Sequence, residues 1–328
     1  MSVEVATERQ PGAGGIRRLV LEPAEAAEIA DQAEKMLSRF RGTSLEDNLG
    51  HIRAAAEDLP PRLRKFLVES RLMESDVFLV SGLPLSTDLP PTPIGWRAAE
   101  EAGTGSREML VLLLCGSLAG DPFSWVTQQD GRIVHDVCPS PRAAHSLTSA
   151  SSLSDLSLHT EDVHHSCRAD YVSLMCLRNP DATATTVSHV DDVQLSPRIR
   201  KLLGETRFRF HPDDSHAENE GLPPDTGAVL FGPPNRPYVR FDVDFMSASD
   251  DAAADAIRVA GEAFEAAAQQ LVLRPGDIVF LDNYRVVHGR QAFAPRYDGN
   301  DRWLKRINLA RDIRRTYRET GRLSRALR

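Results

Sequence analysis

Residues 170–190 read D-Y-V-S-L-M-C-L-R-N-P-D-A-T-A-T-T-V-S-H-V and indicate the fold class of the chain. Two runs in this stretch, Asp170–Leu177 and Ala184–Val190, are rich in β-branched and aromatic side chains, and turn-forming residues lie between them. Short runs of this composition that are bounded by turn residues are typical of β-strands. The stretch therefore predicts two strands of a β-rich core.

The same pattern recurs along the rest of the chain. Further strands are predicted at residues 77–80, 132–137, 156–161, 207–211, 228–231, 238–243, 277–282 and 303–310. Helices are predicted at residues 23–41, 61–72, 107–118 and 251–271. Many short strands indicate a sandwich or barrel. We therefore expect a mostly β fold, an antiparallel β-sandwich with N-terminal helices.

The composition bounds the class of protein. A chain of 328 residues with 41% apolar content can bury a substantial core. Residues 1–15 are polar and contain glycine, so we expect a disordered tail followed by a single domain at 16–328. The formal net charge of -8 argues against nucleic-acid binding. No apolar run approaches the length of a membrane span.

The cysteine spacing gives a further constraint. Cys115, Cys138, Cys167 and Cys176 form no C-x-x-C pair, so neither a zinc knuckle nor a dithiol redox site is expected. Reduced thiols in a cytoplasmic protein fit this usage best. The sequence gives no signal for an oligomeric state.

The stretch S-L-H-T-E-D-V-H at residues 157–164 places two metal-ligating residue types, His159 and Glu161, two positions apart. In an extended strand such residues point to the same face and can bind one ion. Alone the triplet is a weak signal, because it arises easily by chance. The zincin, base-deaminase and serine-hydrolase motifs are all absent from the chain. The two-histidine, one-carboxylate facial triad, which binds iron(II) and leaves positions open, remains.

A facial triad needs a third ligand from a distant part of the chain. The candidate is His288 in D-N-Y-R-V-V-H-G-R, where a predicted strand ends at Gly289. An oxygenase of this kind consumes 2-oxoglutarate, whose far carboxylate needs a fixed bidentate cation, and the planar fork of arginine suits that task. Arg302, shortly after His288, is the candidate for this clamp.

A series of motifs occurs in consistent order between about Pro61 and Arg314. They are W-V-T-Q-Q-D-G-R (125–132), H-T-E-D (159–162), R-A-D-Y-V (168–172), L-R-N-P-D (177–181), A-T-T (184–186), P-D-D-S-H (212–216), R-F-D-V-D-F (240–245), H-G-R (288–290) and R-Y-D-G-N-D-R-W-L-K-R-I (296–307). In this order they resemble the clavaminate-synthase-like iron(II)/2-oxoglutarate oxygenases, in the branch that hydroxylates free amino acids for peptide antibiotics.

The resemblance implies a fold, cofactors and site residues. The implied fold is a double-stranded β-helix, the jelly-roll core of cupin-like proteins, and the implied reactants are Fe(II), 2-oxoglutarate and O2. His159, Glu161 and His288 correspond to the iron ligands, and Arg302, helped by the Thr185 hydroxyl, corresponds to the 2-oxoglutarate clamp. The residues implied to hold the amino and carboxylate groups of the substrate are Gln128, Ser149, Glu161 and Arg306.

Asp242 and Asp244 indicate the substrate side chain. They alternate along a predicted strand and would share one face, unless both are solvated on an edge strand. Two carboxylates in one pocket favour a positively charged side chain, and a guanidinium fits them best. The arginine β-hydroxylases of the family carry a similar Asp-x-Asp. We therefore expect L-arginine, hydroxylated at Cβ or Cγ, in nonribosomal peptide or other natural-product biosynthesis.

Alternatives to this assignment stay open. The lid segment at residues 217–225 is shorter than that of the arginine hydroxylase it resembles, so citrulline, lysine and asparagine remain candidate substrates. The same chemistry can also yield desaturation, and a cupin-like module could bind a metal without turnover. Halogenation is not expected, because Glu161 occupies the position that chloride would need.

Overall fold

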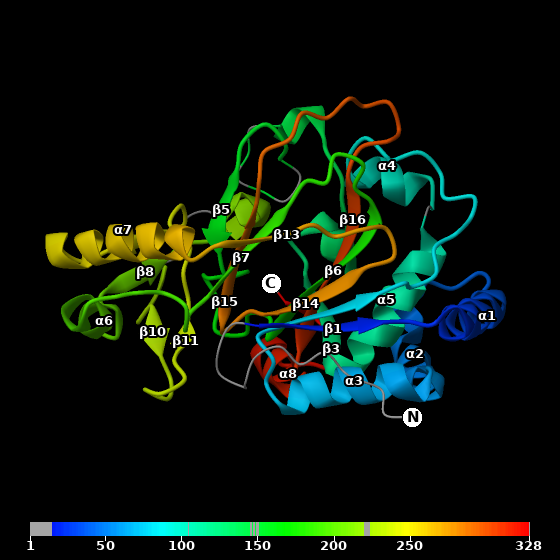
Figure 1. The fold of residues 1–328 in the computed structure, drawn as a ribbon, viewed down its shortest axis with the longest axis horizontal. Coiled ribbons are helices and arrows are strands. Elements are labelled where there is room, and N and C mark those ends of the chain that lie inside the picture. Colours follow the sequence, from blue (N-terminus) through cyan, green and yellow to red (C-terminus); the bar gives the residue numbers. More distant parts are fainter. Residues whose placement is uncertain are drawn as a thin grey trace.

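The computed structural model describes residues 15–103, 105–144, 146, 148, 151–219 and 224–327. Two β-sheets lie face to face at its centre, and helices cover the outer face of the larger sheet (Figure 1). This is the predicted double-stranded β-helix, mostly β with N-terminal helices. All but the last residue of the predicted tail at 1–15 lies outside the described residues.

The larger sheet has the strand order β1-β2-β14-β6-β16-β3-β17, with β4 beside β16. Its strands are β1 (Ile16–Val20), β2 (Val77–Ser81), β3 (Asp121–Trp125), β4 (Val134–Val137), β6 (Tyr171–Arg178), β14 (Ile278–Asp282), β16 (Trp303–Ala310) and β17 (Ala326–Leu327). Strands β14 and β16 are buried along their whole length, because the smaller sheet covers one face and helices cover the other.

The smaller sheet carries the order β13-β7-β15-β5. Its strands are β5 (Leu156–His159), β7 (Thr185–His189), β13 (Gln269–Leu271) and β15 (Val286–Arg290). Side chains from both sheets meet in one hydrophobic cluster, to which Leu174, Val279 and Leu304 contribute from the larger sheet and Val187 and Val286 from the smaller. This cluster is the interior of the sandwich.

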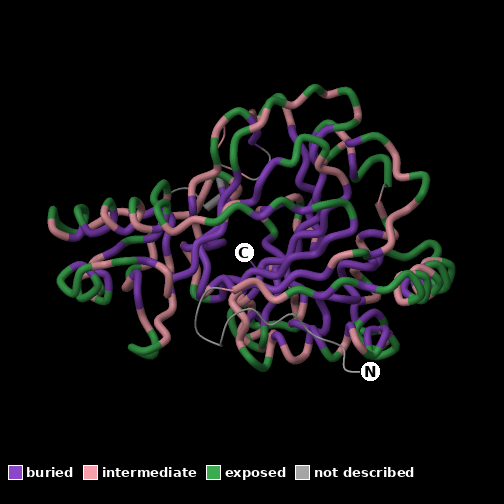
Figure 2. The backbone as a smooth tube through the Cα atoms, in the orientation of Figure 1, coloured by how far each residue is buried: buried purple, intermediate pink, exposed green. Residues whose placement is uncertain are grey.

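The N-terminal helices form the outer layer on the larger sheet. They are α1 (Pro23–Arg39), α2 (Leu49–Ala55), α3 (Pro61–Leu72), α4 (Trp96–Glu101) and α5 (Ser106–Ala119), and α8 (Arg314–Thr320) follows near the C-terminus. From Leu110 to Ala119 every residue of α5 is buried, since this helix lies between the sheet and helices α1, α2 and α3. Figure 2 shows the buried backbone concentrated in the sheets and α5. No described helix has the length and hydrophobicity to cross a membrane.

A separate hydrophobic cluster builds an extension beside the smaller sheet, which we call the outer lobe (the described part of residues 197–266). It contains α6 (Pro197–Leu203), β8 (Phe208–Phe210), β9 (Asp225–Gly227), β10 (Leu230–Phe231), β11 (Tyr238–Val239), β12 (Met246–Ala248) and α7 (Asp251–Ala266). Short 3-10 helices lie at Glu46–Asn48, Ala56–Asp58, Gln129–Gly131, Pro141–Ala143 and Asp214–Asn219.

Most expected elements are confirmed, and three expectations were wrong. The helix predicted at 251–271 ends at Ala266, because Gln269–Leu271 pairs with β7 as strand β13. The strand predicted at 238–243 ends at Val239. The sheets are not wholly antiparallel, since β1 pairs with β2, and β17 with β3, in parallel. In the first and third cases pairing with a distant strand, not local composition, specifies the element.

The register between β5 and β15 positions the residues of interest. His288 lies opposite His159 across this pair and opposite Val187 on the other side. The register shifts between His288 and Arg290, where Gly289 brings the two backbones close together. A Cβ at Gly289 would lie 2.4 Å from the Leu156 carbonyl oxygen and 3.2 Å from that of Ser157. Only glycine fits this approach, and β15 continues through it to Arg290 instead of ending at Gly289.

We expect Gly289→Ala to lower the free energy of unfolding by about 1–3 kcal/mol, because the added methyl group must push backbone and not a flexible side chain. Urea unfolding followed by circular dichroism would measure this change. Gly50→Ala in α2 is the control, since a methyl group there meets nothing within 4 Å. Equal stability of the Gly289→Ala and unaltered proteins would contradict the argument.

Candidate active site

Three side chains predicted to bind a metal converge at the open end of the smaller sheet. His159 is the last residue of β5, Glu161 lies in the loop that follows, and His288 lies in β15. One ligand atom from each lies within 4.8 Å of the others, the one such group among the described residues. Glu161 Oε2 lies 3.8 Å from His159 Nε2 and 3.7 Å from His288 Nε2. The convergence is as predicted, although Glu161 follows the strand and is not part of it.

Hydrogen bonds behind these side chains hold them in place. His159 Nδ1 donates to the Ser157 carbonyl oxygen over 2.8 Å, which makes Nε2 the ring nitrogen that can bind a metal. Asn283, which follows β14 and is buried, accepts from Glu161 N over 2.7 Å and donates to Glu161 O over 3.0 Å. The same amide donates to Ala169 O. Asn283 was not singled out from the sequence; its signal is an amide at the end of an apolar strand next to the His288 motif.

The charges around this cluster fit a divalent cation. Burial raises the pKa of Glu161, but Arg306 and the two histidines outweigh it and hold that pKa well below its usual range. Burial opposes protonation of His159, yet Glu161 and Asp242 raise the pKa of His159 to about 9. Burial and His159 lower the pKa of His288. The carboxylates thus favour positive charge here, and two imidazoles with one carboxylate are the donor set of an iron(II) facial triad.

Arg302 presents a buried guanidinium without an acidic partner in the described chain. It precedes β16, and its Nη2 lies 3.5 Å from the Thr185 hydroxyl at the start of β7. Its Nε has no hydrogen-bond partner within the described residues. Burial and the nearby Arg290 lower the pKa of Arg302 to about 10. A buried cation in this condition fits a carboxylate supplied by a ligand, as predicted for 2-oxoglutarate.

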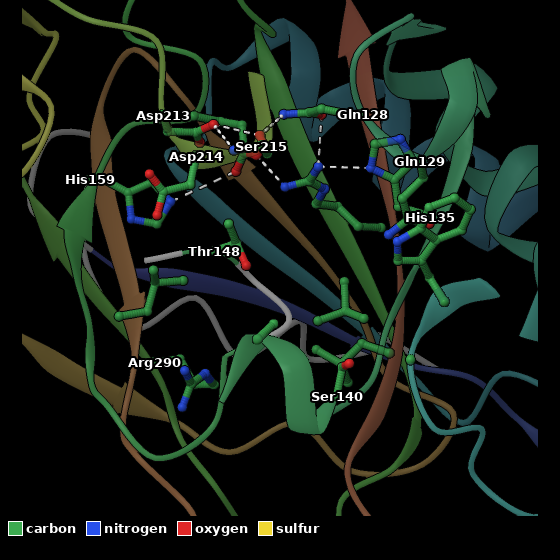
Figure 3. Close-up of a pocket in the computed structure, with 18 of the residues that line it drawn as sticks. Gln128, Gln129, His135, Ser140, Thr148, His159, Asp213, Asp214, Ser215 and Arg290 are labelled. Carbon is green, nitrogen blue, oxygen red and sulfur yellow. Dashed lines mark hydrogen bonds and ion pairs between the residues drawn. The ribbon is translucent and has the colours of Figure 1, made fainter. Parts of the chain in front are cut away.

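These groups share one cavity of about 860 Å³ (Figure 3). Predicted residues that line it together are Gln128, His159, Glu161, Thr185, Asp242, Asp244, His288, Arg302 and Arg306. Ser149, also predicted, lies outside the described residues. Nine of the ten site residues predicted from the sequence therefore line the same cavity.

Arg306 connects the metal-ligating cluster with Gln128. Its Nη1 donates to Glu161 Oε1, and its Nη2 donates to Gln128 Oε1 over 3.0 Å and to His135 Nδ1 over 2.8 Å. Burial and the charge of Arg306 hold the pKa of His135 well below its usual range, so this imidazole accepts as a neutral group. His135 was not predicted, and its signal was only a polar residue between the valines of β4.

The two predicted aspartates share the cavity, but not by strand alternation. The chain leaves β11 at Val239 and turns, and Asp242 Oδ1 accepts from Asp244 N over 3.0 Å and from Phe245 N over 3.2 Å. Asp242 is buried, whereas Asp244 is exposed. Burial raises the pKa of Asp242 to about 6.

A further acid that lines the cavity was not predicted from the sequence. Asp213 lines the cavity in P-D-D-S-H and accepts a hydrogen bond from the Ser215 hydroxyl, and Figure 3 places both near Gln128. Gln128 Nε2 donates to Ser215 Oγ over 2.8 Å. Partial burial raises the pKa of Asp213. The signal was a pair of adjacent acids next to a serine, whose role no spacing rule revealed.

Comparisons with known proteins agree with this geometry. Residues 114–308 match the family model of the taurine catabolism dioxygenase TauD, TfdA family. The enduracididine beta-hydroxylase of Streptomyces hygroscopicus is 38% identical over 91% of this chain and 95% of its own length. The L-ornithine/L-arginine 3-hydroxylase of Catenulispora acidiphila is 41% identical over 79% of this chain and 84% of its own.

A solved structure is also similar over nearly the whole chain. The non-heme iron oxygenase OrfP in complex with Fe, succinate and (3S)-hydroxy-L-Arg has a TM-score of 0.87 and 33% sequence identity, and the match covers 95% of this chain and 99% of the other. OrfP has also been solved with Fe and alpha-ketoglutaric acid, at a TM-score of 0.86.

Proposed function

This chain belongs to the TauD and TfdA family of dioxygenases, and on that premise we propose that it hydroxylates free L-arginine. It is an iron(II)- and 2-oxoglutarate-dependent oxygenase that uses O2. The proposed position of hydroxylation is Cβ or Cγ. The 3-hydroxylase and beta-hydroxylase names of its relatives favour Cβ.

One observation carries the choice of substrate. Several aspartates, among them Asp213, Asp242 and Asp244, line the cavity that also contains the metal-ligating cluster. Carboxylates gathered in a partly buried space repel one another unless a cation lies between them. A guanidinium has five donors in one plane and can satisfy several carboxylates at once, which a neutral amide side chain cannot do.

We assign the cavity residues to four roles: binding iron, binding 2-oxoglutarate, binding the amino and carboxylate groups of arginine, and binding its guanidinium. His159, Glu161 and His288 hold iron, and Arg302 with Thr185 holds the distal carboxylate of 2-oxoglutarate. Gln128, Arg306 and Glu161, with Ser149, hold the amino and carboxylate groups of arginine. The three aspartates bind its guanidinium. The hydrogen bonds of Arg306 to Glu161 and Gln128 support this arrangement.

When bound, iron and 2-oxoglutarate supply the oxidising chemistry: one oxygen atom of O2 enters succinate, carbon dioxide leaves, and the other enters the substrate. The residues of the chain supply orientation. Arg302 fixes the co-substrate at one end, and the aspartates fix the far end of arginine, so that a carbon near the α-carbon faces the metal-ligating cluster. Burial of Glu161, His288 and Arg302 excludes water from the reacting groups.

The setting is also proposed. We infer a small-molecule enzyme that serves nonribosomal peptide or other natural-product biosynthesis, with neither nucleic acid nor membrane as partner. A cytoplasmic location is supported by the four cysteines, which are free and buried as reduced thiols would be.

A panel of free amino acids tests this function. With iron(II), 2-oxoglutarate and O2, we expect L-arginine to gain one oxygen atom by mass spectrometry, with about one succinate formed per product. The panel includes enduracididine, ornithine, citrulline, lysine and asparagine, and a loss of two hydrogens would reveal desaturation. His288→Ala is the control and should form no succinate, because the ligand set is incomplete. Product from another amino acid and none from arginine would exclude the proposed substrate.

The raised pKa of Asp242 predicts a pH dependence. The carboxylate form, which binds a guanidinium, prevails above about 6 and is lost as the pH falls through that value. We therefore expect kcat/KM for arginine to decline below pH about 6 because kcat/KM reports the free enzyme. Asp242→Asn should raise KM for arginine about tenfold or more at neutral pH. The exposed Asp255→Asn on α7 should change neither value, and an unaltered KM in Asp242→Asn would contradict the role.

Arg302→Lys tests the co-substrate end. A lysine ammonium keeps the charge but not the planar fork, so KM for 2-oxoglutarate should rise about tenfold or more. The affinity for arginine, measured separately by calorimetry without O2, should change much less. Arg258→Lys on the exposed face of α7 serves as the control. A KM for 2-oxoglutarate equal to that of the unaltered enzyme would show that Arg302 is not the clamp.

A further inference from the structure

Asp162, the residue after Glu161, is a buried carboxylate that contacts four side chains from three segments of the chain. Its Oδ2 accepts from Trp125 Nε1 over 2.6 Å and from Asn308 Nδ2 over 3.1 Å. Its Oδ1 accepts from Gln128 Nε2 over 3.3 Å and lies 3.1 Å from His216 Nε2. The backbone of Asp162 has a φ of 54°, in the left-handed region that costs a non-glycine residue free energy. The strained residue is therefore held by its side-chain contacts.

His216 is the donor that comes from the outer lobe. It is fully buried, and with its Nε2–H donated to Asp162, its Nδ1 accepts from the Thr127 hydroxyl over 2.6 Å. Its ring stands edge-on to Trp125, with centroids 5.2 Å apart and an interplanar angle of 87°. Both nitrogens thus have partners, and the ring packs against Trp125. His216 therefore attaches the 3-10 helix Asp214–Asn219 to the residues that follow β3.

The residues just before His216 line the cavity in which we propose that arginine binds. Ser215 precedes His216, and its hydroxyl accepts from Gln128 and donates to Asp213. Gln128 in turn accepts from Arg306. One continuous chain of hydrogen bonds therefore runs from Arg306, at the proposed α-carboxylate end, to Asp213, at the proposed guanidinium end. Asp162 and His216 meet this chain at Gln128, whose Nε2 lies 3.3 Å from Asp162 Oδ1 and 3.0 Å from His216 Nε2.

We propose that Asp162 and His216 are positioning residues that set the distance between the two ends of the amino-acid site. This inference rests on the proposed function, because it assigns the two ends to arginine. Asp162 ties the site to the loop of Glu161, and His216 ties it to the segment of Asp213 and Ser215. Loss of either contact would let the acidic end move relative to the metal-ligating cluster, so arginine would bind less tightly and present its carbon less accurately.

The test compares His216→Leu, which has similar volume but no hydrogen bonds, with His216→Gln, which can keep a donor toward Asp162. Arginine affinity is measured by calorimetry on the iron(II)- and 2-oxoglutarate-loaded enzyme without O2. In His216→Leu we expect the Kd for arginine to rise about tenfold or more, with more succinate formed per hydroxylated product. KM for 2-oxoglutarate should stay unchanged, and His216→Gln should restore most of the affinity.

The matched control is His189→Leu. His189 is equally buried and lies 3.4 Å from the carboxylate of Asp76, but Asp76 does not line the cavity, whereas Thr127, the partner of His216, does. A role in stability alone predicts a lower melting temperature in both leucine variants and an unchanged Kd for arginine. If His216→Leu fails to fold, Thr127→Val removes the Nδ1 partner and should shift the same two readouts.

The outcomes separate the two claims. An unaltered Kd and succinate ratio in His216→Leu, or in Thr127→Val if His216→Leu fails to fold, would overturn the positioning role and leave arginine as the substrate. An equal shift in His189→Leu would overturn it too. Failure of the unaltered enzyme to bind or hydroxylate arginine would overturn the proposed function, and the positioning role with it.

Discussion

The register of β5 on β15 is the constraint on which the site depends. It places His288 opposite His159, and the ladder that fixes it continues through β7 into the rest of the smaller sheet. A one-residue slip would turn every side chain of β5 to the other face and separate the two imidazoles. The close approach at Gly289 belongs to the same register. Asn283 adds the third ligand by joining the loop of Glu161 to the turn between β14 and β15. The two histidines are thus held by core strands, and Glu161 lies in a loop that Asn283 fixes to the core.

Charge is separated along the cavity. Arg302 is a buried cation whose partner must be anionic, and Asp213, Asp242 and Asp244 gather at a site whose partner must be cationic. Between them Glu161 directs one oxygen to the histidines and the other to Arg306. A dianionic co-substrate is therefore repelled from the acidic end, and a cationic side chain is repelled from Arg302. This separation of charge therefore orients the co-substrate and the substrate before either makes close contacts.

Local spacing and composition in the sequence predicted many of the helices and strands. The resemblance to a known family predicted the residues of the site. Helix Pro61–Leu72 and strand Trp303–Ala310 have the predicted bounds, and His159, Glu161 and His288 do converge. What the sequence did not predict depends on contacts between distant segments. Strand β13 exists because β7 offers it a partner, against the helical preference of its residues. Asp242 and Asp244 share the cavity through a turn, which two-residue alternation does not describe. Asp213, Asn283 and His135 acquire their places only from the three-dimensional packing.

On the proposed roles, the core carries the residues that would hold iron and 2-oxoglutarate, and the outer lobe carries those that would bind the substrate side chain. The metal-ligating histidines lie on the smaller sheet, and Arg302 and Arg306 lie at the start of and within β16, all tied to the sandwich interior. The three aspartates instead lie on turns that follow outer-lobe strands, Asp213 after β8 and the other two after β11. That lobe shares its hydrophobic cluster with the smaller sheet, because Leu158 of β5 and Val287 of β15 belong to the same cluster, so the lobe packs directly against the strands that carry His159 and His288. Apolar packing thus joins the lobe to the core, and buried polar contacts such as Asp162 to His216 add a directional alignment that apolar packing alone does not provide.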